Sequence, residues 1–241
     1  MNSEELETAP DSASRQPAPA AAETLALTED LALAWLKNLD LPAEEMERIS
    51  RNAAILKSRK VRLALAAHPR TPRRIALRLI REFYTFDLMR FFLLPAGVAA
   101  DLKRAADDLL VSRLASVTLG ERIALARRSS AAVAAALLLD KEARVWQTAL
   151  ENPRITEVAV VKALHRQTAS SAFVEAVCRH LKWSVRPEIR IALLRNAHTP
   201  LARALEYARR IPPAQLRDIL HASHLSETIK EYLREELRSR K

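Results

Sequence analysis

The sequence predicts an all-α protein in which pairs of helices stack side by side. Its 241 residues include only two glycines, too few for the turns of an all-β fold, while good helix formers such as alanine, leucine and arginine dominate. One short phrase also occurs twice, as VRLALAAHPRTP at 61–72 and as IRIALLRNAHTP at 189–200. A phrase that recurs within one chain indicates a repeated structural unit.

The first element is residues 1–27, which we expect to form a disordered acidic tail. Alanine, proline, serine and glutamate without apolar periodicity cannot bury enough surface to offset the entropy of ordering. Such a tail can fold over a basic part of the chain and compete with an outside ligand, or it can simply aid solubility. We favour the solubilising role.

Residues 28–241 form the second element, a domain of helix pairs. Apolar-periodic runs of roughly 10 to 15 residues alternate there with signals for a helix end followed by a helix start. In the first copy of the phrase, His68 and Pro69 mark the end of one helix. Thr71 is the predicted N-cap of the next helix, and Pro72 suits its first turn.

A third copy of the phrase, RVWQTALENPRIT, places Asn152 where the first copy has His68, and Thr156 as the cap of the following helix. The copies lie 84 and 44 residues apart, which suggests a unit near 42 residues, in the range of the two-helix units of α-solenoids. Residues 86–95 also align with 214–223 at the 128-residue offset that relates the first two copies, which predicts duplication of a multi-helix block.

The phrases HPRTPRRIALRLI and NAHTPLARALEYA resemble the bacterial leucine-rich repeat variant and, more loosely, HEAT-like or armadillo-type repeats, over residues 55–210. This resemblance implies a right-handed α-solenoid of HEAT-like helix pairs with a curved surface. Some leucine-rich repeat variant proteins hold an iron–sulfur cluster through several cysteines. Because Cys178 is the only cysteine here, that property does not transfer, and we expect no cofactor.

Charge is distributed unevenly along the chain. Residues 1–50 carry 3 Lys/Arg and 11 Asp/Glu, whereas residues 51–81 carry ten Lys/Arg and no acidic residue. Guanidinium groups bind phosphates bidentately, so this segment is a candidate surface for an anion or an acidic partner. The alternative is a solvated outer face. The candidate residues are Arg59, Lys60, Arg62, Arg70, Arg73, Arg74, Arg78 and Arg81.

Aromatic residues offer two further interpretations. One group could form an exposed patch for a partner, but we favour a core beneath a loop; it comprises Phe83, Tyr84, Phe86, Phe91 and Phe92. Trp146 and Trp183, with Asp140, invite comparison with HEAT-like DNA glycosylases, which combine a basic concave surface with aromatic residues and a catalytic aspartate. Asp140 can equally cap the helix that follows it.

His221 and His224 are three residues apart and can share a helical face, but no third metal ligand accompanies them in a known motif. The sequence also contains no GxxxxGK[ST], GxSxG, HExxH or CxxC pattern. We therefore expect neither a metal site nor catalysis.

These observations predict a non-catalytic scaffold that binds another macromolecule, a protein in our preferred interpretation, through its curved surface. The alternative function is nucleic-acid binding through the arginine-rich repeats, and a repair-type hydrolase is third. The sequence has no export signal and no apolar stretch that could span a bilayer, so we expect a cytoplasmic protein without a membrane partner. The partner and the oligomeric state stay open.

Overall fold

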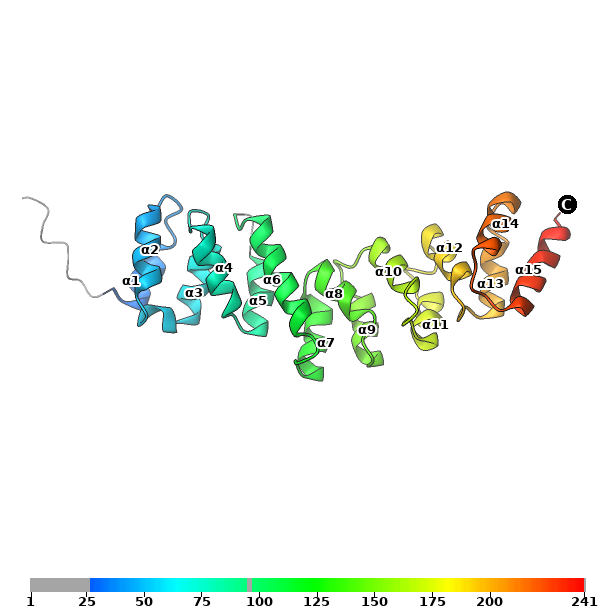
Figure 1. Cartoon of the computed structure of the whole chain (residues 1–241), viewed down its shortest axis with the longest axis horizontal. Coiled ribbons are helices and arrows are strands. Elements are labelled where there is room, and N and C mark those ends of the chain that lie inside the picture. The colour runs from blue at the N-terminus through cyan, green and yellow to red at the C-terminus, as the bar shows by residue number, and fades with distance from the viewer. Residues whose placement is uncertain (1–26, 95–96, 241) are drawn as a thin grey trace, which may run out of the picture.

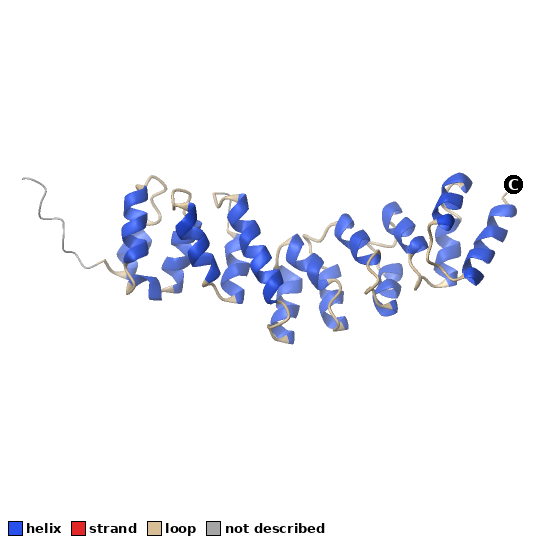
Figure 2. Ribbon diagram, viewed as in Figure 1, coloured by secondary structure: helices blue, strands red, loops and turns tan. Residues whose placement is uncertain are grey.

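The computed structural model describes residues 27–94 and 97–240, so the predicted tail lies outside the described residues except for Leu27. Every regular element in these ranges is a helix, which confirms the all-α prediction (Figure 2). The helices are α1 (Glu29–Trp35), α2 (Ala43–Arg51), the short 3₁₀ helix η1 (Ile55–Lys57), α3 (Arg59–Ala67), α4 (Arg73–Arg81), α5 (Thr85–Leu93), α6 (Ala100–Arg113), α7 (Leu119–Arg128), α8 (Ala131–Leu137), α9 (Ala143–Leu150), α10 (Glu157–Leu164), α11 (Ser171–Arg179), α12 (Pro187–Arg195), α13 (Leu201–Ala208), α14 (Pro213–His221) and α15 (Glu227–Arg238).

The helices lie in two rows along the long axis of the molecule (Figure 1). Odd-numbered helices pack against one another in the odd row, with contacts between α1 and α3, α3 and α5, α7 and α9, α9 and α11, and α13 and α15. Even-numbered helices form the even row, which is continuous from α4 through α14. Helices that follow each other in sequence, such as α5 and α6, join the rows. The molecule is therefore an elongated, repeat-like stack of helix pairs.

The core is one continuous cluster of buried apolar side chains that runs along the stack between the rows. Its largest fully buried side chains include Phe91, Phe173 and Trp183. Fully buried alanines such as Ala66 and Ala126 belong to the same cluster. No helix pair has enough apolar surface to form this core alone, so each pair depends on its neighbours.

The two most similar phrases form the same turn, but Thr71 acts differently from the sequence prediction. Its hydroxyl donates a 2.6 Å hydrogen bond backwards to the carbonyl of Leu65, and Thr199 makes the same bond to Leu193, also at 2.6 Å. The N-cap of α4 is Pro72, so the prediction that Thr71 caps the next helix is wrong. These threonines instead satisfy carbonyls at the end of the preceding helix.

The third copy differs at this point. The side chain of Thr156 accepts a 3.3 Å hydrogen bond from the backbone N–H of Ala159, in the first turn of α10. This confirms the predicted cap for Thr156.

Three aligned residues, His68, Asn152 and Asn196, occupy equivalent positions at the ends of α3, α9 and α12. In each case a side-chain atom accepts a hydrogen bond from the backbone N–H two residues later, at 3.2, 2.8 and 2.9 Å respectively. This local bond turns the chain away from the helix. The aligned phrases thus form the same bend, as the repeat hypothesis requires.

The same three side chains also donate to a carbonyl at the end of the preceding helix in their own row or in the turn just after it. His68 Nε2–H reaches the carbonyl of Asn38 at 3.0 Å, and Asn152 Nδ2 reaches that of Ala126 at 2.7 Å. Asn196 Nδ2 reaches the carbonyl of Leu164 at 2.6 Å. We call these bonds end-capping contacts, because they reach carbonyls at or just beyond the end of a helix, where the helix itself supplies no donor.

Other residue types make end-capping contacts elsewhere in both rows. In each pair the first residue donates from its side chain to the backbone carbonyl of the second: Trp183 to Leu150, Tyr207 to Cys178, Ser223 to Leu194, Arg113 to Phe83, Arg78 to Ser50 and Arg240 to Ala208. The bonded residues are 28 to 33 positions apart in these six pairs, which corresponds to one helix pair.

The repeating unit is accordingly shorter than the sequence predicts. Successive helices of one row begin 24 to 34 residues apart, and a step of about 42 residues crosses three helices. Three is an odd number, so the phrase at 61–72 starts in the odd row with α3, whereas the phrase at 189–200 starts in the even row with α12. The predicted 42-residue unit is wrong. The same turn sequence follows helices of both rows, so the spacing between its copies is not the length of one helix pair.

The end-capping contact of Asn152 gives a testable prediction. Asn152 is 1% exposed, and its amide donates to two carbonyls, so Asn152→Ala leaves these buried acceptors without their partner. We expect the free energy of unfolding to fall by about 2 kcal/mol in urea denaturation.

Asn38→Ala is the matched control. Asn38 is exposed and accepts the same local bond, from Asp40 N–H at 3.0 Å, but within the described ranges its amide caps no earlier helix. Its replacement should lower the free energy of unfolding by less than about 0.5 kcal/mol. Equal costs at both positions would contradict the structural role of end-capping contacts.

Candidate partner-binding surface

The arginines at the start of α4 bridge to the neighbouring helices of the even row. Arg73 Nε donates to Asp101 of α6 at 2.6 Å, and this bond lowers the pKa of the Asp101 carboxyl. Arg74 pairs with Glu47 of α2 on the other side. Arg73 and Arg74 are therefore linked to carboxylates on either side of α4, and these carboxylates reduce the positive potential at its start.

Three further candidates also have partners from other elements. Arg70 pairs with the carboxylate of Asp40 at 2.9 Å, and Arg78 donates to the carbonyl of Ser50 at 3.2 Å. Arg62 lies 3.9 Å from Glu82. The Arg70–Asp40 pair is exposed, and such a pair contributes little stability by itself. The effect of these three contacts is to keep the guanidinium groups close to the protein's own acceptors.

Arg59 has the strongest internal partner of the eight candidates. Its guanidinium donates to both carboxylate oxygens of Asp87, with NH2 2.8 Å from Oδ1 and Nε 3.1 Å from Oδ2. The Asp87 side chain is only 9% exposed, so its charge depends on this bidentate bond. The same hydrogen bond raises the pKa of Arg59. The pair joins α3 to α5 and is structural.

Lys60 and Arg81 are the two exposed candidates whose side chains have neither a carboxylate nor a carbonyl partner in the described part of the chain. The structure thus divides the predicted basic surface. Six of its eight members contact acceptors from other elements, and two project into solvent.

The aromatic group on and before α5 is divided in the same way. Phe83 and Phe91 are buried, with ring centroids 5.9 Å apart, as the core interpretation predicts. Tyr84 is 63% exposed, beneath the guanidinium of Arg59, and Phe86 is 39% exposed. Phe92 is partly buried, so the group is divided between the core and the surface.

The residues compared with DNA glycosylases lie in structural positions. Trp146 is 4% exposed and packs edge-on against Phe173, and Trp183 is 1% exposed. Asp140 accepts a hydrogen bond from the backbone N–H of Glu142 and lies 3.3 Å from Arg122 in a nearly buried ion pair. The bond to Glu142 turns the chain just before α9, but the N-cap of α9 is Glu142, so the interpretation that Asp140 caps this helix is wrong.

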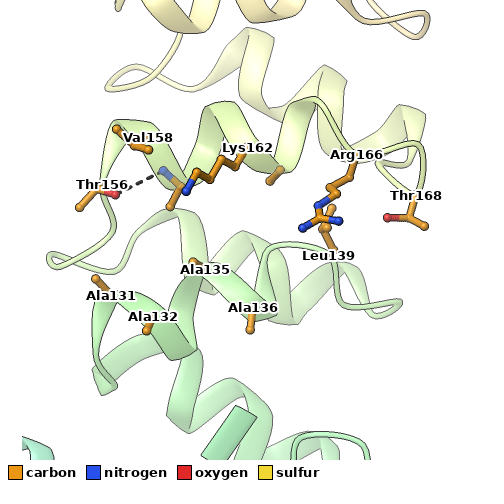
Figure 3. Close-up of a pocket in the computed structure, with 12 residues that line it drawn as sticks. Ala131, Ala132, Ala135, Ala136, Leu139, Thr156, Val158, Lys162, Arg166 and Thr168 are labelled. Carbon is orange, nitrogen blue, oxygen red and sulfur yellow. Dashed lines mark hydrogen bonds between the residues drawn. The ribbon is translucent and has the colours of Figure 1, made fainter. Parts of the chain in front are cut away.

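The structure reveals a shallow cavity of about 480 Å³ between α8 and α10 that the sequence interpretation missed (Figure 3). We call it the alanine groove. Four small side chains of α8 form its floor, and they are Ala131, Ala132, Ala135 and Ala136. Leu139 and Val158 add apolar surface, and Val158 is 61% exposed. The signal in the sequence was the run SAAVAAALLLD, which lacks polar residues where an exposed helix face would carry them.

Two basic side chains, Lys162 and Arg166, line the same groove from the side of α10 (Figure 3). No carboxylate belongs to its lining in the part of the chain that the structure describes. The groove therefore combines an apolar floor of small residues with a positive edge. Such a surface accepts an apolar segment that also carries negative charge.

No family model matches this chain, and no curated protein or solved structure is significantly similar to it. Among the helices that the structure describes, none is long and apolar enough to cross a membrane. No group of three or more His, Cys, Asp or Glu side chains in the same ranges lies in an arrangement that could hold a metal ion.

The Arg59–Asp87 pair can be tested by stability measurements. Arg59→Gln leaves the buried Asp87 carboxylate without its bidentate donor, so we expect the melting temperature to fall by several degrees. Arg74→Gln, which removes the more exposed ion pair with Glu47, is the control and should change the melting temperature little. Equal losses would mean that burial of Asp87 does not decide the effect.

Asp107 on α6 gives a prediction about pH. It is 8% exposed, its Oδ1 atom has no hydrogen-bond partner among the described residues, and burial raises the pKa of its carboxyl. The folded state then binds the proton more tightly than the unfolded state, so stability falls as the pH rises through the folded pKa.

Asp107→Asn should therefore stabilise the protein at pH 7, by about 1 kcal/mol, with the gain shrinking below about pH 4. Denaturant unfolding at both pH values measures this difference. Asp218→Asn, which removes an exposed carboxyl on α14, is the control and should show no such gain. A loss of stability at pH 7 would contradict the assignment of an unfavourable buried charge.

Proposed function

We propose that this protein is a non-catalytic scaffold that binds another protein through the even-row face of a right-handed, HEAT-like α-solenoid. The alanine groove carries this proposal. Exposed alanines on α8 leave room for the backbone of a partner segment to approach closely, and Leu139 and Val158 supply apolar contact. Lys162 and Arg166 supply charge at the edge.

The partner that fits this surface is a helical segment with one apolar face and acidic residues beside it. Its apolar face would lie on the alanine floor, and its carboxylates would pair with the basic edge, which lacks internal acidic partners in the lining. The internal pairing of most N-terminal arginines favours this interpretation over nucleic-acid binding, because six of the eight candidates already contact acceptors within the chain. The reducing cytoplasm remains our proposed location, and the buried, free thiol of Cys178 is compatible with it.

Affinity capture from the native cell with the full chain tests the proposal. A partner is isolated with the unaltered chain, and its affinity is then measured for Ala136→Glu and for Ala202→Glu. Ala136→Glu adds bulk and negative charge inside the groove, so we expect at least a tenfold loss of affinity. Ala202 is an exposed alanine on α13 in the other row, so Ala202→Glu should bind as the unaltered chain does.

Duplex DNA and RNA are titrated in parallel at two salt concentrations. Steeply salt-dependent binding that is lost in a Lys60→Glu/Arg81→Glu double variant would support the nucleic-acid alternative. A protein partner that binds the Ala136→Glu chain without loss would overturn the assignment of the groove.

A further inference from the structure

A second cavity lies where the ends of three even-row helices meet. It measures about 330 Å³ and is formed by the C-terminal ends of α10 and α12, the turn after α12 and the loop after α14. Five basic or imidazole side chains contribute to its lining, and we call them the His/Arg pocket: His165, Arg166, Arg195, His198 and His224. No carboxylate belongs to this lining in the described part of the chain.

The C-terminal end of a helix normally repels an anion, because its last carbonyls point outwards. Here those carbonyls already accept hydrogen bonds. The carbonyl of Leu164 accepts from Asn196 Nδ2 at 2.6 Å, and that of Leu194 accepts from Ser223 Oγ at 2.7 Å. The carbonyl of Arg195 accepts from the backbone N–H of His224 at 3.0 Å. The end-capping contacts of this row therefore offset much of the negative potential at the pocket.

The basic groups of the pocket, by contrast, have unmet capacity to donate. Arg195 Nε is buried and has no hydrogen-bond partner within the described ranges. Neither Arg166 nor Arg195 forms an ion pair with a carboxylate of the described residues, unlike Arg73 and Arg74 on α4. Two arginines and three histidines thus line one space whose described lining contains no acidic residue.

Guanidinium groups match the oxygens of a phosphate through parallel N–H donors, and imidazole N–H groups add single bonds to the remaining oxygens. No set of the pocket's histidines lies in a metal-holding arrangement within the part of the chain that is described. We infer that the His/Arg pocket is a binding site for a phosphate-type oxyanion. The inference does not depend on the proposed scaffold function, because it needs no protein partner.

The phosphate can be free in solution or attached to a peptide. Arg166 lines the alanine groove as well as the His/Arg pocket, so the two cavities adjoin on the same face. A peptide in the groove would therefore bring a phosphorylated side chain within reach of the pocket. Both sources present the same group to the same donors.

Titration of the full chain with inorganic phosphate tests the site, with binding followed by calorimetry and by the NMR signals of the imidazole rings. We expect saturable binding in the millimolar range or tighter. Arg195→Gln and His198→Gln should each weaken it at least tenfold. His198 is exposed and supports the fold through its backbone N–H, so its variant should fold normally even if Arg195→Gln does not.

His221→Gln is the matched control, because His221 is exposed on α14 and does not line the pocket. It should bind phosphate as the unaltered chain does. Absence of saturable binding, or equal weakening by His221→Gln and His198→Gln, would overturn the inference.

A parallel titration with N-acetyl-phosphoserine amide distinguishes the two sources. Tighter binding of this compound than of inorganic phosphate supports a phosphorylated protein segment as the ligand. Equal binding supports free phosphate. If phosphate binds saturably while Ala136→Glu leaves partner binding unchanged, the His/Arg pocket is supported as an anion site. The alanine groove is then not the site of the protein partner.

Discussion

The fold depends on how the carbonyl groups at the ends of its short helices find hydrogen-bond donors. Most of its α-helices have seven to ten residues, so the unpaired last turn is a large part of each one. A side chain from the next helix of the same row supplies a donor in both rows, as Asn152 does for Ala126 and Tyr207 for Cys178. Because such a bond requires a fixed distance and direction, it positions each helix against the previous one. Apolar burial then holds this arrangement together.

The same constraint explains which parts of the repeat are visible in the sequence. A donor is required at each helix end, but histidine, asparagine, serine, tryptophan, tyrosine and arginine all provide one. Only three of these positions lie in a recognisable phrase. The all-α fold, the turns at His68 and Asn196 and the stacking of helix pairs could therefore be predicted. The length of the unit could not, because the phrase at Asn196 serves the opposite row from the phrase at His68.

The candidate surface was harder to predict, because the net charge of a sequence segment differs from the net charge of the surface to which that segment contributes. Residues 51–81 contain no acidic residue, yet carboxylates from Asp40, Glu47, Asp87 and Asp101 reach their arginines from neighbouring helices. Those carboxylates come from positions 27 to 30 residues away, one helix pair along the chain. Counting local charge cannot detect them. The alanine groove and the His/Arg pocket escaped for the same reason, since each is assembled from segments that only the stack brings together.

Position along the stack therefore decides what each basic residue can do. Arg73 and Arg74 at the start of α4 have carboxylate partners on α6 and α2, and an outside anion must compete with these carboxylates, which are already at hydrogen-bond distance. Arg195 has no such neighbour in the described lining of its pocket, and the carbonyls beside it already have donors. An incoming anion there does not have to displace a carboxylate, so we expect the basic groups between α10 and α14 to bind an anion more tightly than the paired arginines of residues 51–81.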